Sequence, residues 1–231
     1  MQSVLVTGVG RAGQLGEAVA LAFAARGARV IAVGHSLGEV SERVAALRVA
    51  GKEAHAFACD LTDEAQVRAL AIDVARVTGG ALDALVNLAG GFAMSGRVAE
   101  SDPAVWNRQF ALNLTTAYHA TRAMLPMLRE ARGAVAFVAS AAALPGARVA
   151  EMSAYAAAKG GVLTLMRAVA AEERGAVRAN AVAPTGIDTA ANSATAGTGS
   201  RLVAREAVAD AIVFLCSDEA RAITGTVIPL E

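Results

Sequence analysis

The chain has 231 residues, 55% of them hydrophobic and 18% charged, so it is long enough to bury a core as a single α/β domain. Its formal net charge is zero, which gives no basic field to attract nucleic acid or an anionic membrane surface. The two cysteines, Cys59 and Cys216, form no CxxC pair or His/Cys cluster, which argues against a disulfide framework or a bound metal and favours a cytoplasmic protein. We expect no secretion signal or membrane span, because residues 1–6 run directly into a predicted strand.

Short β-branched runs alternate with helical patterns along the chain, which is typical of βαβ units and of a parallel sheet covered by helices on both faces. We expect strands near 3–7, 28–33, 54–58, 83–87, 134–139, 177–182 and 226–229. Helices are expected near 16–26, 38–50, 63–77, 103–130, 153–174 and 205–217, with Thr62, Asp102 and Ser153 at helix starts and Gly51 and Gly175 past helix ends. No repeat or linker interrupts the pattern, so we expect one domain, 1–231.

The first strand is followed by a glycine-rich turn, residues 7–16, that contains Gly8, Arg11, Gly13 and Gly16. Glycines at such a turn let backbone N–H groups approach a pyrophosphate at the positive end of the next helix. A glycine-rich turn is weak evidence alone, but its place between a strand and a helix favours dinucleotide binding over a plain tight turn.

Tyr155 and Lys159 lie one turn apart on one face of the predicted 153–174 helix. A neighbouring cation stabilises phenolate over phenol, so we expect Lys159 to lower the pKa of Tyr155 and make it a catalytic acid or base. The pair also occurs by chance on many helices, with the tyrosine half buried and the lysine in water.

Six motifs in order resemble the classical short-chain dehydrogenase/reductase family over essentially the whole chain. They are Thr7-Gly8 with Gly13 and Gly16, Asn87-Leu88-Ala89-Gly90, Asn113, Ser140, Tyr155-xxx-Lys159 and Pro184-Thr185-Gly186. The resemblance implies a Rossmann-like doubly wound fold, a seven-stranded parallel sheet with helices on both faces, and an NAD(P)-dependent oxidoreductase that acts on a small or medium carbonyl or secondary alcohol.

In this family the four catalytic positions, Asn113, Ser140, Tyr155 and Lys159, form a proton relay. By this resemblance Ser140 would bind the substrate oxygen and Tyr155 would exchange a proton with it. Lys159 would hold the nicotinamide ribose, and Asn113 would support a water molecule that links Lys159 to solvent. From the residues alone, Ser140 could instead cap the next turn and Asn113 could simply interrupt a helix.

Further residues are expected to bind the cofactor by the same resemblance. Asp60 would contact the adenine ring, although an Asp before Thr62 could equally form a turn. The remaining candidates are Leu61, Asn87, Ala89, Gly90, Pro184, Ile187 and Thr189, with Tyr155 and Lys159 also touching the cofactor.

The end of the second strand indicates a preference for NADP(H) over NAD(H). An NAD enzyme of this fold usually carries a carboxylate here, and Gly34 occupies the matching position. Arg11 and His35 are possible partners for the 2′-phosphate of NADP.

Several segments depart from the family pattern. The glycine turn is longer than TGxxxGxG, so the pyrophosphate loop could be reshaped and Arg11 could point elsewhere. Leu88 replaces an Asn, Thr185 replaces the PG glycine, and segment 144–151, which borders the expected active site, is slightly long. Segment 187–200 corresponds to the family's substrate lid and is rich in small residues, which indicates a mobile cover.

We expect Phe92 in the wall of the substrate pocket, with Gly91 and Met94 as further candidates and Trp106 packed in the core. Two alternative functions stay open: a non-catalytic dinucleotide sensor or scaffold, and a relative that reduces a C=C bond or a pteridine-like ring. The resemblance also implies a homotetramer or homodimer that packs through the 103–130 and 153–174 helices. In those helices the apolar residues Ala117, Ala120, Met124, Leu128, Val162, Leu165, Met166 and Val169 fit burial on more than one side.

Overall fold

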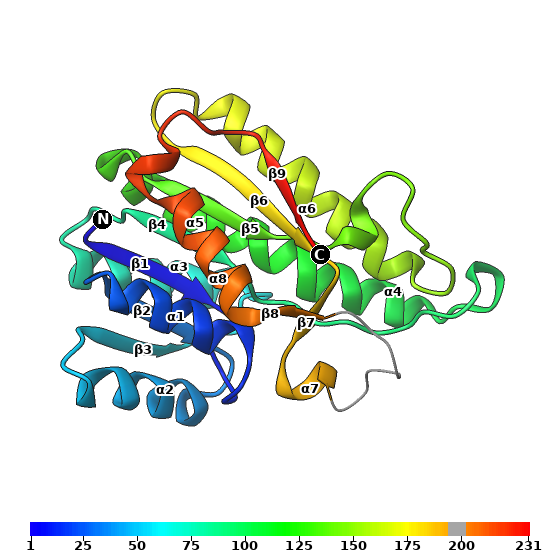
Figure 1. Ribbon diagram of the computed structural model, residues 1–231, viewed down its shortest axis with the longest axis horizontal. Helices are drawn as coiled ribbons and strands as arrows, with labels where there is room; N and C mark the ends of the chain where they lie inside the picture. The colour runs from blue at the N-terminus through cyan, green and yellow to red at the C-terminus, as the bar shows by residue number, and fades with distance from the viewer. Residues whose placement is uncertain (194–201) are drawn as a thin grey trace.

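The computed structural model describes residues 1–193 and 202–231, and a parallel seven-stranded sheet lies at its centre (Figure 1). In spatial order the strands are β3 (Ala54–Ala58), β2 (Arg29–Gly34), β1 (Ser3–Thr7), β4 (Ala84–Asn87), β5 (Ala134–Val138), β6 (Arg178–Pro184) and β9 (Val227–Leu230). The order reverses between β1 and β4, and ligands of open α/β sheets bind outside the carboxyl ends of the strands at such a reversal. The expected fold class, a seven-stranded parallel sheet in the Rossmann-like order, is therefore confirmed.

Helices cover both faces of the sheet. One face carries α1 (Leu15–Ala25), α2 (Leu37–Val49) and α8 (Arg205–Cys216), and the other carries α3 (Glu64–Thr78), α5 (Thr116–Ala131) and α6 (Ser153–Glu172). Figure 1 shows α1 and α8 together on the near face. Among the described residues, no helix is both long and apolar enough to span a bilayer.

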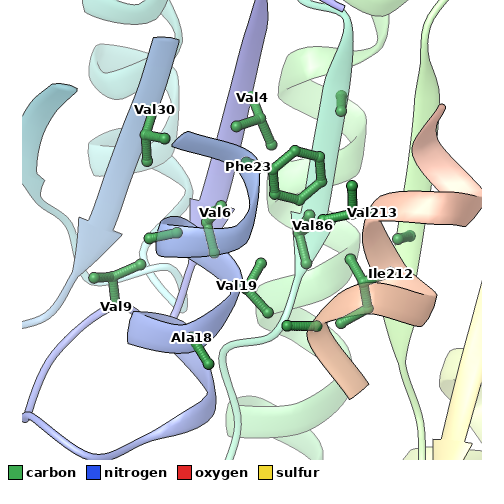
Figure 2. Close-up of a cluster of buried hydrophobic side chains, with 14 of the residues drawn as sticks. Val4, Val6, Val9, Ala18, Val19, Phe23, Val30, Val86, Ile212 and Val213 are labelled. Carbon is green, nitrogen blue, oxygen red and sulfur yellow. The ribbon is translucent and has the colours of Figure 1, made fainter. Parts of the chain in front are cut away.

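Each face of the sheet has its own apolar core, because successive strand residues point to opposite sides. Val4 and Val6 of β1 belong to the core under α1 and α8, whereas Leu5 belongs to the opposite core. Figure 2 shows the first core, in which Phe23 of α1 packs between the sheet and α8. Phe23 is fully buried, and such burial contributes about 2–3 kcal/mol per large side chain. The strands are thus fixed from both sides, which holds their carboxyl ends in place.

The predicted 103–130 helix is divided into α4 (Pro103–Phe110), a π-helical segment (Ala111–Thr115) and α5. Asp102 caps α4 as expected, since its carboxylate accepts from the N–H of Ala104 at 2.8 Å. Two expected caps are wrong: α3 is capped by Asp63 and not Thr62, and Ser153 is the first residue of α6, whose N-cap is Met152.

Short elements that the sequence did not predict follow β6. They are β7 (Gly186–Asp188), α7 (Ala190–Ser193) and β8 (Leu202–Ala204), and β7 pairs with β8 in a separate two-stranded sheet. The rest of the expected lid, residues 194–200, lies outside the described residues.

The apolar side chains that were taken to support an oligomer interface are mostly buried inside this one chain. All but Leu165 are at most 5% exposed and pack in the core under α3, α5 and α6. Trp106, which we expected in the core, is 41% exposed and stacks on Phe110, with ring centroids 4.8 Å apart. The outer face of α4 is therefore more apolar than the sequence suggested.

Candidate active site

A cavity of about 920 Å³ opens at the carboxyl ends of β1, β4, β5 and β6. It is lined by residues that follow each of these strands, so it lies where the strand order reverses. The structure brings together in its wall most of the residues predicted from the sequence. These are Gly8, Arg11, Gly16, His35, Gly90, Asn113, Ser140, Tyr155, Lys159, Pro184, Ile187 and Thr189.

Ser140 and Tyr155 both lie in this wall. Burial raises the pKa of the Tyr155 phenol above its usual value, and the Ser140 hydroxyl nearby partly offsets this. Ser140 thus lowers this pKa, and the expected effect of the Lys159 charge on it stays a prediction. Ser140 also caps a 3₁₀ turn (Ala141–Ala143), so the structural role considered for it is present beside its position at the site.

Lys159 is buried on α6, and its Nζ donates to the carbonyl oxygen of Val138 at 2.8 Å. This Nζ lies 5.9 Å from the centre of the Tyr155 ring. Burial lowers the pKa of Lys159 to about 8. The ammonium therefore loses its proton much more easily than an exposed lysine.

Asn113 lies in the π-helical segment between α4 and α5. Its Oδ1 accepts from the N–H of Gly91 at 3.2 Å, while its Nδ2 donates to the Gly91 carbonyl at 2.9 Å. It also donates to the carbonyl of Gln109 at 3.0 Å. Single π-helical turns inside α-helices often occur at functional sites, because the extra residue redirects a side chain.

The glycine turn approaches the end of β4 closely. Gly8 has a φ of +75°, and a Cβ there would lie 2.9 Å from the Ala89 nitrogen. The Thr7 hydroxyl also accepts from the N–H groups of Leu88 and Ala89, both at 3.0 Å. The backbone of this turn therefore faces the cavity without side chains in the way, and the residues present fit a dinucleotide phosphate at the start of α1.

Five of the predicted cofactor residues do not line the cavity. Gly13 is turned away, because its N–H donates to Glu17 at 2.7 Å and its carbonyl accepts from Ala190. Asp60 accepts from both Thr62 N–H and the Thr62 hydroxyl, which is the turn that we considered as the alternative.

The other three residues outside the cavity wall have structural contacts. The buried Asn87 donates to Thr121 at 2.8 Å, and its Oδ1 has no hydrogen-bond partner among the described residues. The carbonyl of Leu61 lies 3.0 Å from the His119 ring, and Ala89 binds Thr7 as described above.

A family model described as short chain dehydrogenase matches residues 2–200. The chain belongs to the short-chain dehydrogenase/reductase family. It is 35% identical to 2-(S)-hydroxypropyl-CoM dehydrogenase 3 of Xanthobacter autotrophicus, over 99% of this chain and 94% of that protein. It is also 35% identical to cis-4-hydroxycyclohexanecarboxylate dehydrogenase of Sinomonas cyclohexanicum, over 96% and 92% of the two chains. A short-chain dehydrogenase/reductase structure from Burkholderia xenovorans aligns with a TM-score of 0.90 at 34% identity, covering 100% and 94% of the two chains. The protein is thus an NAD(P)-dependent oxidoreductase.

Glu39 is a residue of this short-chain dehydrogenase/reductase that sequence reasoning missed. It lines the cavity at the start of α2, where its Oε2 is 3.1 Å from the position of a Cβ built on Gly10. The signal was available, because Ser36 and Glu39 have the spacing of a capping box and Ser36 does cap α2. A carboxylate here can accept from ribose hydroxyls and repels a phosphate.

Gly34 has no space for any side chain. A Cβ on it would lie 2.1 Å from the Val9 carbonyl oxygen and 2.6 Å from Val40 Cγ2. The same turn is held against β2 by the hydrogen bond from Val9 N–H to the Val33 carbonyl, at 3.0 Å. The missing carboxylate at the end of β2 is therefore a consequence of how closely the lengthened glycine turn packs.

The substrate end of the cavity is formed by two segments that the sequence also indicated. Phe92 and Gly91 line the cavity, whereas Met94 and Trp106 do not. The Phe92 ring meets the Tyr155 ring edge to face, with centroids 5.1 Å apart. From the slightly long segment 144–151, Ala147 and Arg148 line the same cavity.

Proposed function

We propose that this enzyme transfers a hydride between NADP(H) and a small or medium carbonyl compound or secondary alcohol. The observation that carries the proposal is the presence of Ser140, Tyr155 and buried Lys159 in the wall of one cavity, which is large enough for a dinucleotide and a substrate. The names of the two relatives specify 2-hydroxypropyl and 4-hydroxycyclohexane groups, which are secondary alcohols.

In this mechanism the bound nicotinamide supplies or accepts the hydride. Ser140 donates a hydrogen bond to the substrate oxygen and holds it next to the Tyr155 hydroxyl. In reduction Tyr155 gives its proton to that oxygen, and in oxidation its phenolate takes the proton back. Lys159, when protonated, stabilises the phenolate by its charge and binds the ribose hydroxyls, while Asn113 keeps the Gly90–Gly91 backbone in place.

The preference for NADP(H) is supported by Arg11 and His35, which are exposed at the end of the cavity near the glycine turn. Either side chain can bind a 2′-phosphate by charge-assisted hydrogen bonds. Glu39 in the same wall opposes this attraction, so the preference is small. Removing the positive charge of Arg11 should weaken the preference for NADP(H), and removing the negative charge of Glu39 should strengthen it.

We also propose that two or four copies assemble through α4 and α5. The exposed rings of Trp106 and Tyr118, rather than the buried residues named above, support this surface. Light scattering on the protein and on Trp106→Glu tests it. The parent should have at least twice the monomer mass and the variant should be smaller, whereas a monomeric parent refutes this assembly.

The function is tested with Tyr155→Phe, assayed on a panel of ketones, aldehydes and secondary alcohols at the nicotinamide absorbance. We expect the parent to turn over at least one of them and kcat to fall by about 10²–10⁴-fold in the variant. The parent and Tyr155→Phe should both still bind NADPH, which a fluorescence titration measures. Tyr118→Phe is a matched control, because Tyr118 is the only other tyrosine of the chain and lies on the surface of α5.

Two outcomes favour the alternatives. NADPH binding with no turnover of any carbonyl, alkene or pteridine substrate favours a dinucleotide sensor or scaffold. If the enzyme reduces a C=C bond or a pteridine-like ring, and Ser140→Ala keeps this activity, the second alternative function is favoured. That chemistry does not need Ser140 at a carbonyl oxygen.

A further inference from the structure

The charged side chains that line the cavity separate into groups by position. Arg11, His35 and Glu39 follow β1 and β2, at the end of the cavity assigned to the adenosine. Lys159 is buried and donates to Val138. Arg148 is the remaining charged residue of the described lining, and it belongs to the segment between Ser140 and Tyr155. A cation is thus present on the substrate side, with no role in the mechanism above.

The other cavity-lining residues of the segment that carries Arg148 are apolar. They are Ala141, Ala142, Ala147 and Met152, and the Phe92 ring lines the same cavity. Arg148 is exposed and has no hydrogen-bond or ion-pair partner among residues 1–193 and 202–231. An unpaired guanidinium beside an apolar wall suits a substrate with a compact hydrocarbon body and one anionic end, because its fork of N–H groups binds carboxylate or sulfonate in two places.

The segment that carries Arg148 is hydrogen-bonded to the residues that follow Phe92. The carbonyl of Glu151 accepts from the N–H groups of Ser95 and Gly96, at 2.7 and 3.1 Å, and from the Ser95 hydroxyl at 3.2 Å. Glu151 adopts a φ of +61°, an unusual conformation for a non-glycine residue. These contacts join the Arg148 segment to the one that carries Phe92, so the backbone of both segments is held together beside the cavity.

We propose that Arg148 binds an anionic group of the substrate, so that the enzyme acts on hydroxy or keto acids and sulfonates in preference to neutral ketones. The inference rests on the proposed function for its catalytic part. The name of one relative specifies a hydroxycyclohexanecarboxylate, which has this combination of a ring, a hydroxyl and an anion.

The test compares 4-oxocyclohexanecarboxylate, 2-(2-oxopropylthio)ethanesulfonate and neutral 4-methylcyclohexanone as substrates for the parent, Arg148→Ala and Arg148→Lys. We expect the parent to prefer one or both anions, and Arg148→Ala to lose about tenfold to a hundredfold in kcat/KM on them. Turnover of the neutral ketone should be unchanged, and Arg148→Lys should keep part of the preference. The substrate whose kcat/KM falls more in Arg148→Ala, the carboxylate or the sulfonate, identifies the anion that Arg148 binds. Arg97→Ala is the matched control, because Arg97 is exposed nearby and does not line the cavity.

A binding measurement separates this inference from the proposed function. Calorimetric titration of the two anions into each protein saturated with NADP⁺ does not require turnover. Tighter binding to the parent than to Arg148→Ala, with no reduction of any ketone, would uphold the anion site and overturn the proposed chemistry. The anion site would be refuted if both anions bound the parent and Arg148→Ala equally and the parent had the same kcat/KM for the anions and the neutral ketone. An equal loss of kcat/KM on all three substrates in Arg148→Ala would also refute it.

Discussion

Asn113 holds both polar groups of the Gly91 backbone through its side-chain amide, at 3.2 and 2.9 Å. This pair of hydrogen bonds joins the π-helical segment to the turn after β4, which contributes Gly90, Gly91 and Phe92 to the cavity. Gly90 is packed so closely that a Cβ on it would lie 2.6 Å from the Asn113 Oδ1. The position of this wall therefore depends on one side chain.

Replacing Asn113 by Ala should lower both stability and activity. The change removes the hydrogen bonds to the Gly91 backbone and to the carbonyl of buried Gln109, at a cost of about 1–3 kcal/mol in the free energy of unfolding. We also expect kcat/KM to fall at least tenfold because the Phe92 wall shifts. Urea unfolding and steady-state kinetics measure the two effects. Asn107→Ala, on the exposed side of α4, should change neither, and an Asn113→Ala protein with parental values for both would contradict this role.

Ser140→Ala should move the pH dependence of alcohol oxidation to higher pH. The neighbouring Ser140 hydroxyl lowers the pKa of Tyr155, so its loss raises that pKa further. Oxidation requires the phenolate, and its rate therefore rises through this pKa. The pH at half-maximal kcat/KM should increase in Ser140→Ala and return toward the parental value in Ser140→Thr. An unchanged midpoint together with normal turnover would show that Ser140 does not act on Tyr155.

Lys159→Met should change how stability depends on pH. Burial lowers the pKa of Lys159 from 10.5 to about 8. Between these values the unfolded lysine is protonated and the folded one is not, so folding releases a proton and the free energy of unfolding rises with pH. Below pH 8 both states are protonated, and this slope disappears.

The measurement is urea unfolding of the protein without ligand, from pH 7 to 10. The parent should gain stability relative to Lys159→Met by about 1.4 kcal/mol per pH unit above pH 8. The buried cysteines and Tyr155, whose pKa values are raised, titrate in both proteins and cancel in the difference. A difference that is the same at pH 7 and pH 10 would mean that Lys159 is not shifted in the folded state.

Arg11→Ala and Glu39→Gln should change the cofactor preference in opposite directions. Loss of the Arg11 charge weakens the attraction for a 2′-phosphate, so binding of NADPH should weaken more than that of NADH. Loss of the Glu39 carboxylate removes repulsion, so NADPH binding should strengthen while NADH binding weakens or is unchanged. Fluorescence titration with both nucleotides measures the ratio. Equal effects on both nucleotides in either variant would refute a role in preference.

The sheet was predictable from sequence because its strands are buried on both faces and stand out as β-branched runs, such as 29–33. Tyr155 and Lys159 were predictable because helix geometry alone places them together. The π-helical segment around Asn113 was not, because its extra residue is stabilised by contacts with Gly91 that are distant in sequence. Gly13 was also placed differently from expectation, since Glu17 and Ala190 bind both of its polar backbone groups. The capping-box spacing of Ser36 and Glu39 marked the start of α2, but the position of Glu39 in the cavity wall also depended on the packing of α2 beside the glycine turn.

The close packing of Gly34 against Val9 limits how this enzyme can change its cofactor during evolution or redesign. Grafting an aspartate onto the end of β2 is the obvious way to favour NAD(H), yet here the graft collides with the carbonyl of Val9, a residue whose N–H is hydrogen-bonded to β2. A variant of that kind needs a shorter glycine turn at the same time. Single substitutions that alter specificity have to come from side chains that reach the ribose from neighbouring elements, and Glu39 on α2 is already in such a place.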